Sequence, residues 1–422
     1  MIEKRAFCGH TKTTERMINM KYIVILGDGM ADYPVEYFDG KTILEAADKP
    51  TIDYMCAHGE LGMCKTVQDG MKPGSDVANL SVMGYDTAKS YTGRSPLEAA
   101  SIGVEMRDDD VTFRTNLVTL SDEEDYADKT MLDYSAGEIT TEESTELMRA
   151  IADALDTDKI KFYPGISYRH LCVWNGGSTD VDLTPPHDIS DKPIRDHLPK
   201  GTGADKLLEM MKASEKILKD HPVNKARIEN GLNPATSIWV WGEGTKPNVG
   251  NFEAKYGVKG AVISAVDLIK GIAKCAGMRS IDVPGATGNC ETNWNGKAQA
   301  ALDVLLEGYD FVYVHMEAPD EMGHQGKPDK KKFAVETIDS KVVKFLKTEL
   351  EKRGIDYRML IMPDHPTPIS LKTHVSDPVP YVIYDSTKTD GGSGLTYTEK
   401  NGESTGIYIE KGYTLMDRFL GK

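Results

Sequence analysis

The amino-acid sequence predicts an α/β protein in which a domain built on a largely parallel sheet is interrupted by a smaller α+β domain. Three runs, Tyr22–Leu26, Phe311–His315 and Met359–Met362, are almost wholly apolar, as expected of strands buried on both faces of a parallel sheet. From about residue 110 the strand-like runs instead alternate apolar and polar residues between helical patterns, which is typical of an α+β unit.

This change of pattern predicts the domain boundaries. We expect residues 20–110 and 236–422 to form the larger domain and residues 111–235 to form the insert. Residues 1–19 are polar and charged and lack the apolar core of a signal peptide, so we expect a loosely ordered extension before Met20.

The first part of the larger domain begins with a strand and a glycine turn. The strand Tyr22–Leu26 runs into Gly27-Asp28-Gly29, where the flanking glycines permit a tight turn and a close approach to Asp28. On the simpler interpretation, Asp28 is only a turn residue. A helix at Pro50–His58, with proline at its start, and a strand at Leu61–Val67 are expected to follow.

Ser75 has two interpretations. It follows a Pro-Gly turn and precedes an apolar-periodic run, so it is expected to be the N-cap of a helix. The same position also presents its hydroxyl at the positive end of that helix, a suitable place for a nucleophile that carries a phosphate. A second helix is expected after Pro96, and Arg94 before it is either an anion contact or a solvated cation.

The insert is expected to contain two helices and several half-exposed strands. Period-two alternation predicts the strands, and acids in the first turn after Thr141 support one of the helix starts. The expected elements are a strand at Thr112–Val118, a helix at Thr140–Ala154, a hairpin of Phe162–Gly165 with Arg169–Trp174, and a helix at Gly203–Lys219.

The parallel pattern is expected to resume near Pro234. The expected strands are Ser237–Trp241, Gly260–Ser264 and Val379–Tyr384, and the expected helices are Asp267–Ala276, Ala298–Glu307 and Lys330–Lys352. Gly242–Gly244 and Gly391–Gly394 are interpreted as loops, because neither has the spacing of a nucleotide-binding glycine loop.

Composition limits the classes of function. The 422 residues carry a formal net charge of −16, which argues against nucleic acid or an anionic membrane surface as a partner. A small phosphorylated substrate is still compatible, because a local cationic pocket can outweigh the global charge. No apolar run approaches the length of a membrane span, and the six cysteines form no C-x-x-C pair, as expected of reduced thiols in a cytoplasmic protein.

Seven polar side chains lie at or near the ends of predicted strands. Open α/β sheets bind ligands at the carboxyl ends of their strands, and aspartate and histidine are ligands of first-row metals. An i,i+4 pair such as Asp320 and His324 shares one face if the turn is helical. The seven residues are Asp28, Ser75, Asp320, His324, Asp364, His365 and His374.

The charges in this set point to two cations. Three carboxylates and a serine alkoxide carry four negative charges, which two divalent ions would balance. Without metals the acids would repel one another and some would be protonated. With metals, one ion can activate the serine and both can bind phosphoryl oxygens.

In their order along the chain, these residues resemble the alkaline-phosphatase superfamily and, more narrowly, the cofactor-independent phosphoglycerate mutases of archaeal type. The resemblance runs from about Met20 to the C-terminus. Pro366-Thr367-Pro368 departs from the Gly-Asn that follows this Asp-His in the longer bacterial mutases, but it suits the archaeal-type branch. The motifs that carry the resemblance are Gly27–Met30, Pro73–Gly84, Tyr91–Pro96, Ala318–Gly326 and Pro363–Pro366.

The resemblance implies an alkaline-phosphatase-like three-layer α/β/α domain interrupted by a smaller α+β domain that binds substrate. It implies two divalent metal ions, for which Mn, Mg, Co and Zn all accept such ligands, and no 2,3-bisphosphoglycerate. It also implies that Ser75 is the nucleophile, that Asp28, Ser75, Asp364 and His365 surround one metal, and that Asp320, His324 and His374 bind the other.

The activity implied is the interconversion of 3-phosphoglycerate and 2-phosphoglycerate through a phosphoserine, in glycolysis and gluconeogenesis. The enzyme must retain glycerate, so cationic groups of the insert are expected to bind it, although each of these could instead be ordinary surface charge. The candidates for the carboxylate and acid/base roles are Arg114, Arg169, His170 and His187, with Arg94 and Lys270 as further contacts.

Two alternative functions use the same residues. Members of this branch in bacteria have been proposed as functional analogues of homoserine kinase, so a kinase-like phosphotransferase is one alternative. It would need a phosphoryl donor, and the chain lacks the G-x-x-x-x-G-K-[ST] cradle. The other alternative, a metal-binding protein that has lost catalysis, is opposed by an intact Ser75. The sequence does not determine the oligomeric state.

Overall fold

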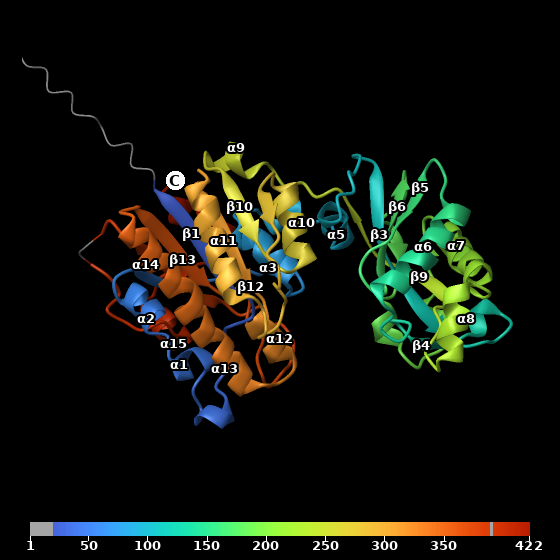
Figure 1. The fold of residues 1–422 in the computed structure, drawn as a ribbon, viewed down its shortest axis with the longest axis horizontal. Coiled ribbons are helices and arrows are strands. Elements are labelled where there is room, and N and C mark those ends of the chain that lie inside the picture. The colour runs from blue at the N-terminus through green and yellow to red at the C-terminus, as the bar shows by residue number, and fades with distance from the viewer. Residues whose placement is uncertain (1–19, 389–390) are drawn as a thin grey trace, which may run out of the picture.

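The computed structural model describes residues 20–388 and 391–422. The extension expected at residues 1–19 lies outside the described residues. Figure 1 shows two bodies, a larger one in which helices cover a sheet and a smaller one in which helices α6, α7 and α8 lie beside strands β3, β6 and β9. Within the described ranges, none of the helices is long and apolar enough to cross a membrane.

The larger body is built on an eight-stranded sheet. Strand β1 lies between β12 and β13 and is parallel to both, and β10 and β11 continue the parallel set, while β14 pairs antiparallel with β13 and β2. In spatial order the strands are β11 (Arg279–Ile281), β10 (Gly260–Ile263), β12 (Phe311–Met316), β1 (Lys21–Gly27), β13 (Tyr357–Met362), β14 (Val379–Asp385), β2 (Glu60–Cys64) and β15 (Tyr408–Ile409).

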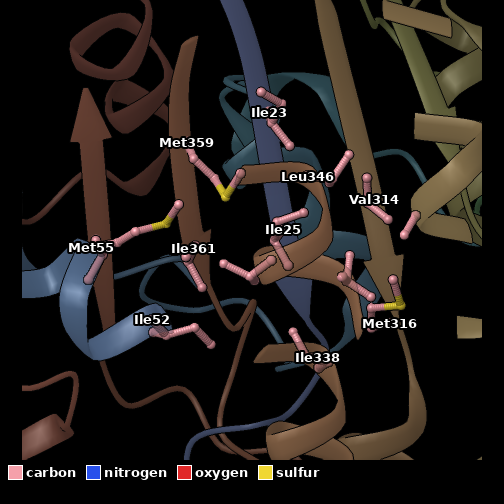
Figure 2. Packing of buried hydrophobic residues seen from close by; sticks show 14 of the residues in the cluster. Ile23, Ile25, Ile52, Met55, Val314, Met316, Ile338, Leu346, Met359 and Ile361 are labelled. Carbon is pink, nitrogen blue, oxygen red and sulfur yellow. The ribbon is translucent and has the colours of Figure 1, made fainter. Parts of the chain in front are cut away.

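Both faces of this sheet are buried, as the continuous apolar runs predict. Successive side chains of a strand point to opposite faces, so Ile23 and Ile25 pack into one core cluster, and Val24 and Leu26 pack into the other. Figure 2 shows Ile23 and Ile25 in the first cluster beside side chains of β12, β13 and the covering helices.

Helices cover the sheet on both sides and give the three layers. The first core cluster is closed by α1 (Ile43–Ala46), α2 (Pro50–Ala57), α11 (Trp294–Leu306), α13 (Pro328–Thr337) and α14 (Lys344–Lys352). The second is closed by α3 (Ser75–Val82), α9 (Phe252–Tyr256), α10 (Asp267–Cys275) and α16 (Leu415–Leu420). The single helix expected at Lys330–Lys352 is α13 and α14, joined by a π-helical turn at Ile338–Val343.

The smaller body holds a second, five-stranded sheet with its own hydrophobic core. Its central strand, β3, pairs antiparallel with β6 on one side and with β9 on the other. The strands are β3 (Asp110–Leu120), β4 (Met131–Asp133), β5 (Ile160–Tyr163), β6 (Arg169–Asn175) and β9 (Ser237–Thr245), and the helices are α6 (Thr141–Leu155), α7 (Ala204–Leu218) and α8 (Pro222–Glu229).

Strand β9 corrects two predictions. Ser237–Trp241 was expected in the parallel sheet, but it pairs antiparallel with β3 in the smaller sheet. The loop expected at Gly242–Gly244 is the continuation of the same strand. An apolar strand whose neighbours bury both its faces has the same local pattern in either sheet, so its pairing partner could not be inferred from that pattern.

Helix α5 (Ser95–Ser101) joins the two bodies. It packs against α10 of the larger body and against β3, β6 and β9 of the smaller one. The Ser95 hydroxyl donates to the Thr112 carbonyl of β3 at 3.0 Å. On the other side, Gly271 of α10 lets the Leu97 carbonyl approach closely, since a Cβ at Gly271 would lie 1.9 Å from that oxygen. This contact places the insert beside the carboxyl ends of the parallel strands.

Candidate active site

Three parallel strands end beside one another and deliver polar side chains to one place. Asp28 follows β1, Asp320 lies on α12 (Ala318–His324) just after β12, and Asp364 and His365 follow β13. Because β1 pairs with both β12 and β13, these carboxyl ends are adjacent. The prediction that strand-end side chains converge is therefore confirmed for these residues.

Ser75 does not cap its helix, which corrects the N-cap prediction. The cap of α3 is Gly74, with extended backbone and no side-chain hydrogen bond, and Ser75 is the first helical residue. The Ser75 hydroxyl lies 3.3 Å from Asp28 Oδ2 and 3.2 Å from His365 Nε2. The hydroxyl is thus free of a capping role and faces two potential proton acceptors.

Asp28, Asp364 and His365 form one compact donor group and are almost completely buried. His365 Nε2 lies 3.5 Å from Asp28 Oδ1 and 3.4 Å from Asp364 Oδ2. Asp364 accepts hydrogen bonds at Oδ1 from the backbone N–H groups of Gly29 (3.1 Å) and His365 (2.9 Å). These bonds hold the carboxylate in one orientation, as a metal ligand requires.

Asn79, one turn after Ser75, ties the serine to this group. Its side-chain amide donates to the Ser75 carbonyl at 2.8 Å and to Asp364 Oδ2 at 2.7 Å. Its own oxygen accepts the Tyr313 hydroxyl of β12 at 2.5 Å. Asn79 and Tyr313 are both fully buried, so Ser75 and Asp364 are held at a fixed separation.

A second donor group surrounds Asp320. Asp320 Oδ2 lies 3.3 Å from His324 Nε2, and Oδ1 lies 3.3 Å from His374 Nε2. The two Nε2 atoms lie 2.9 Å apart, so His324 and His374 point at one position. His365 also lies within reach of Asp320 and His374, and it therefore stands between the two donor groups.

The electrostatics of the two groups differ. Burial, followed by the charges of Asp364 and Asp320, raises the pKa of Asp28 well above its usual value. Burial would also raise the pKa of Asp320, but hydrogen bonds from His324 and His374 hold it well below the usual range. The Asp320 carboxylate in turn raises the pKa of His324 to about 9.

These groups fit divalent cations by their chemistry. Carboxylate and imidazole donors are the ligands that Mg, Mn, Co and Zn accept. The buried Asp28 Oδ1 has no hydrogen-bond partner within residues 20–388 and 391–422. A buried, uncompensated carboxylate oxygen is costly, and a cation beside it would remove that cost.

Two cavities open beside the donor groups. One is lined by Ser75, Asp320, His324 and His374 together with the loop 70–77. The other, of about 290 Å³, lies between the two bodies and is lined by Arg169 and His170 of β6. Both cavities are also lined by Arg94, Glu317, Val266 and Leu268, so they are neighbouring parts of one cleft.

The structure places three of the predicted substrate contacts in this cleft. Arg94 lies where the two cavities meet, and Arg169 and His170 line the one between the bodies. His170 is buried and accepts from the Gly165 N–H at Nδ1, so its own proton is on Nε2, and burial lowers its pKa to about 3. Arg114 lines neither cavity: it is mostly buried, stacked on Trp241 and paired at 3.0 Å with Glu98, which lines the cavity between the bodies.

Two predicted contacts lie elsewhere. His187 is exposed on the insert, where it packs edge-on against Trp241, and it lines neither cavity of the cleft. Lys270, on α10, is paired with Asp282 at 2.7 Å and also lines neither cavity. The prediction of a substrate contact is therefore not supported for either residue.

Other residues of the site gave no recognisable sequence signal. Glu317 lines both cavities, and burial, with the charge of Asp320 adding to it, raises its pKa to about 7. His315 is fully buried and bonds Asp28 Oδ2 through Nε2 at 2.9 Å. His315 lies inside a predicted strand and Glu317 lies just after it. Only their closeness to Asp320 in the sequence could have suggested that they belong to the site.

The architecture and the donor groups together define the class of protein. A three-layer α/β/α domain with polar donors at its strand ends, interrupted by a smaller α+β domain, is an architecture that solved structures share with this chain. A solved structure, the PH0037 protein from Pyrococcus horikoshii, superposes with a TM-score of 0.77 at 28% identity, over 95% of this chain and 97% of that chain. The cofactor-independent phosphoglycerate mutase from Thermoplasma acidophilum superposes with a TM-score of 0.67 at 25% identity, over 95% of this chain and 99% of that chain.

Sequence comparison identifies the family. A family profile described as 2,3-bisphosphoglycerate-independent phosphoglycerate mutase matches residues 56–224. A protein of Geobacter sulfurreducens named as a probable enzyme of this kind is 49% identical over 96% of this chain and 100% of its own length. The 2,3-bisphosphoglycerate-independent phosphoglycerate mutase of Methanosarcina barkeri is 48% identical over 94% of this chain and 98% of its own length. The chain belongs to the family of 2,3-bisphosphoglycerate-independent phosphoglycerate mutases, and the resemblance stated from the sequence is confirmed.

Proposed function

We propose that this protein interconverts 3-phosphoglycerate and 2-phosphoglycerate, with Ser75 carrying the phosphoryl group between the two positions. The relatives named above support the substrate class. The observation that carries the mechanism is the position of the Ser75 hydroxyl, which is free of capping and lies 3.3 Å from Asp28 and 3.2 Å from His365. A hydroxyl beside such acceptors is arranged as a nucleophile.

In the first transfer, Ser75 Oγ forms a bond to phosphorus and the bond from phosphorus to the 3-oxygen of glycerate breaks. Asp28 and His365 stand within reach of the Ser75 proton, and the departing glycerate oxygen takes up a proton. In the second transfer the 2-hydroxyl of glycerate loses a proton and attacks phosphorus, and the bond to Ser75 Oγ breaks. The two transfers together need no external phosphoryl donor and consume no water.

We propose that two divalent cations complete the site. Asp28, Asp364 and His365, with Ser75, would hold one of them, and Asp320, His324 and His374 would hold the other. When bound, the ions would neutralise the clustered acids, favour the ionised serine and bind the phosphoryl oxygens. The donor set accepts Mn, Mg, Co or Zn without selecting among them.

The cleft between the two bodies would hold the glycerate while it is reoriented. Arg94 and Arg169 offer guanidinium groups for its carboxylate, and His170 lines the same cavity. Residues 111–235, together with the strand β9, would form the substrate-binding insert, and the remaining described residues would form the metal-binding domain. Motion of one against the other would admit substrate.

The expected setting is the cytoplasm, in glycolysis and gluconeogenesis. The free cysteines among the described residues are compatible with a reducing compartment. The net charge of −16 supports a small phosphorylated substrate as the partner and argues against nucleic acid or a membrane surface.

The test is product analysis with purified protein, 3-phosphoglycerate and Mn²⁺ or Mg²⁺, without ATP and without 2,3-bisphosphoglycerate. Phosphorus NMR should show 2-phosphoglycerate accumulating to equilibrium with little inorganic phosphate. Release of phosphate without 2-phosphoglycerate would make the protein a phosphatase. Inactivity on phosphoglycerates joined with donor-dependent phosphorylation of homoserine would favour the kinase-like alternative, which no observation in the structure favours.

A further inference from the structure

Thr367 touches both donor groups. It lies two residues after His365 in the loop that follows β13 and is fully buried. Its hydroxyl donates to Asp320 Oδ1, in one donor group, and lies 3.3 Å from His365 Nδ1, in the other. It is therefore a direct side-chain link between the two groups, through a residue that is not expected to bind metal itself.

The directions of these hydrogen bonds follow from the donor inventory. An ionised carboxylate can only accept, so the single hydroxyl hydrogen of Thr367 goes to Asp320. The contact with His365 is then a bond in which Nδ1–H donates to the threonine oxygen. This leaves the lone pair of His365 on Nε2, the atom that faces Ser75 at 3.2 Å and Asp28 at 3.5 Å.

The surrounding chain is shaped around this hydroxyl. Gly29 has a φ of +61°, and a Cβ there would lie 2.5 Å from both Thr367 Oγ1 and Asp320 Oδ1. A Cβ at Gly323 would lie 2.5 Å from the Thr367 carbonyl oxygen. Two glycines, from the turn after β1 and from α12, thus make room for one threonine, and a larger residue at either position would push the donor groups apart.

A buried ammonium group, that of Lys331, binds the backbone carbonyl of Thr367. Lys331 of α13 is fully buried and donates from Nζ to the Thr367 carbonyl at 2.8 Å, the Ala31 carbonyl at 3.2 Å and Asp32 Oδ2 at 2.7 Å. Its three protons are therefore all used. Lys331 joins the loop after β1 to the loop after β13.

We propose that Thr367 is a positioning residue that sets the tautomer of His365 and couples the two metal sites. Through one hydroxyl it keeps the His365 proton on Nδ1, so that Nε2 is available to a metal or to the serine. Through the same hydroxyl it orients Asp320 in the neighbouring group. The inference rests on the metal and serine site proposed above, but its predictions concern the free protein and its metal affinity, not turnover.

The matched variants are Thr367→Val, which keeps the shape and removes the hydroxyl, and Thr367→Ser, which keeps the hydroxyl. Nitrogen-15 NMR of histidine-labelled, metal-free protein reports which ring nitrogen of His365 carries the proton, with a His365→Asn variant for assignment. Titration calorimetry with Mn²⁺ reports the affinity of each site. Circular dichroism and thermal melting check that each variant is folded.

We expect His365 to carry its proton on Nδ1 in the unmodified protein and in Thr367→Ser. In Thr367→Val the Nε2–H form should appear, and Mn²⁺ binding should weaken by about 10- to 100-fold, as is usual when a partner of a metal ligand is removed. Unchanged tautomer and Mn²⁺ affinity in Thr367→Val would overturn the proposal, as would a Thr367→Ser protein that behaves like Thr367→Val.

The proposal can be tested even if Thr367→Val does not fold. The unmodified, metal-free protein alone must show the Nδ1–H tautomer at His365, and an Nε2–H tautomer would refute the proposal. These readouts use no substrate, so they separate the proposal from the proposed activity. A protein that fails to form 2-phosphoglycerate could still show the expected tautomer and metal affinities, and the reverse also holds.

Discussion

The two walls of the cleft differ in how firmly their side chains are held. On the strand-end wall, Asp28, Asp364 and His365 are at most 2% exposed, and Asp364 accepts hydrogen bonds from two backbone groups and from Asn79. On the facing wall, Arg169 is exposed and stacks on Tyr168, and the side chain of Arg94 is 48% exposed. The difference suggests that the first wall performs the chemistry and the second adapts to the substrate.

If this division holds, the largest effect should come from the nucleophile. Ser75→Ala should lower kcat by about 10⁴-fold or more, because the substitution removes the hydroxyl proposed to carry the phosphoryl group. The free energy of unfolding should change by less than about 1 kcal/mol, because Ser75 is not the helix cap. Steady-state kinetics and chemical denaturation measure the two quantities. A folded, active Ser75→Ala protein would contradict the proposal that the strand-end wall performs the chemistry.

Removal of metal should also act on the first wall. Chelation should reduce activity to background, and Mn²⁺, Co²⁺ or Mg²⁺ should restore it. The metal-loaded protein should be more stable by about 3 kcal/mol for each bound ion at an ion concentration near one hundred times the dissociation constant, because the ions bind the folded acids. Thermal melting with and without chelator measures this, and full activity in the chelated protein would contradict the two-cation site.

A smaller effect, on substrate affinity, is expected from the second wall. Arg169→Ala should raise KM for 3-phosphoglycerate by about 10- to 100-fold, the value of a hydrogen bond to a charged group, with a lesser effect on kcat. The matched control is Lys270→Ala, since Lys270 is paired with Asp282 and lies outside the cleft. If both variants raised KM equally, the loss would reflect general charge and not a contact in the cleft.

The last effect concerns pH and comes from His170. Burial lowers its pKa from 6.5 to about 3, so the folded protein keeps it neutral while the unfolded chain binds a proton. Its contribution to stability is complete above pH 6.5 and is lost as the pH falls from there toward 3. His170→Gln should therefore flatten the dependence of unfolding free energy on pH by up to about 1.4 kcal/mol per unit in that range.

Denaturant unfolding at several pH values between 4 and 7 measures this dependence. An identical slope in the variant and the unmodified protein would show that His170 is more exposed in solution than in the structure, and the second wall would then be looser than described.

The sequence predicted the first wall well, because its residues follow strands that can be recognised locally. Asp28 and Asp364 each come just after a continuous apolar run. Asp320 lies in the short helix that follows a third such run. The carboxyl ends of parallel strands must meet, so convergence follows from the fold class alone. The prediction that Ser75 is the N-cap was wrong by one residue, since the N-cap of α3 is Gly74.

The second wall and the positioning residues could not be predicted in the same way. His170 and His187 are both histidines of the insert, and only tertiary packing buries one and exposes the other. Thr367 contacts Asp320, which is 47 residues away, through an ordinary hydroxyl, and no local pattern marks it. Strand β9 pairs with β3 more than a hundred residues earlier, so its sheet could not be read from its own sequence.

The central claim is that Ser75 carries the phosphoryl group, and mass spectrometry tests it directly. Protein incubated with 3-phosphoglycerate and Mn²⁺, then quenched in acid, should yield a peptide containing Ser75 that bears one phosphoryl group. The same treatment of Ser75→Ala should yield no phosphorylated peptide and no 2-phosphoglycerate. Formation of 2-phosphoglycerate by Ser75→Ala, or a phosphoryl group on another residue of the active protein, would contradict the account.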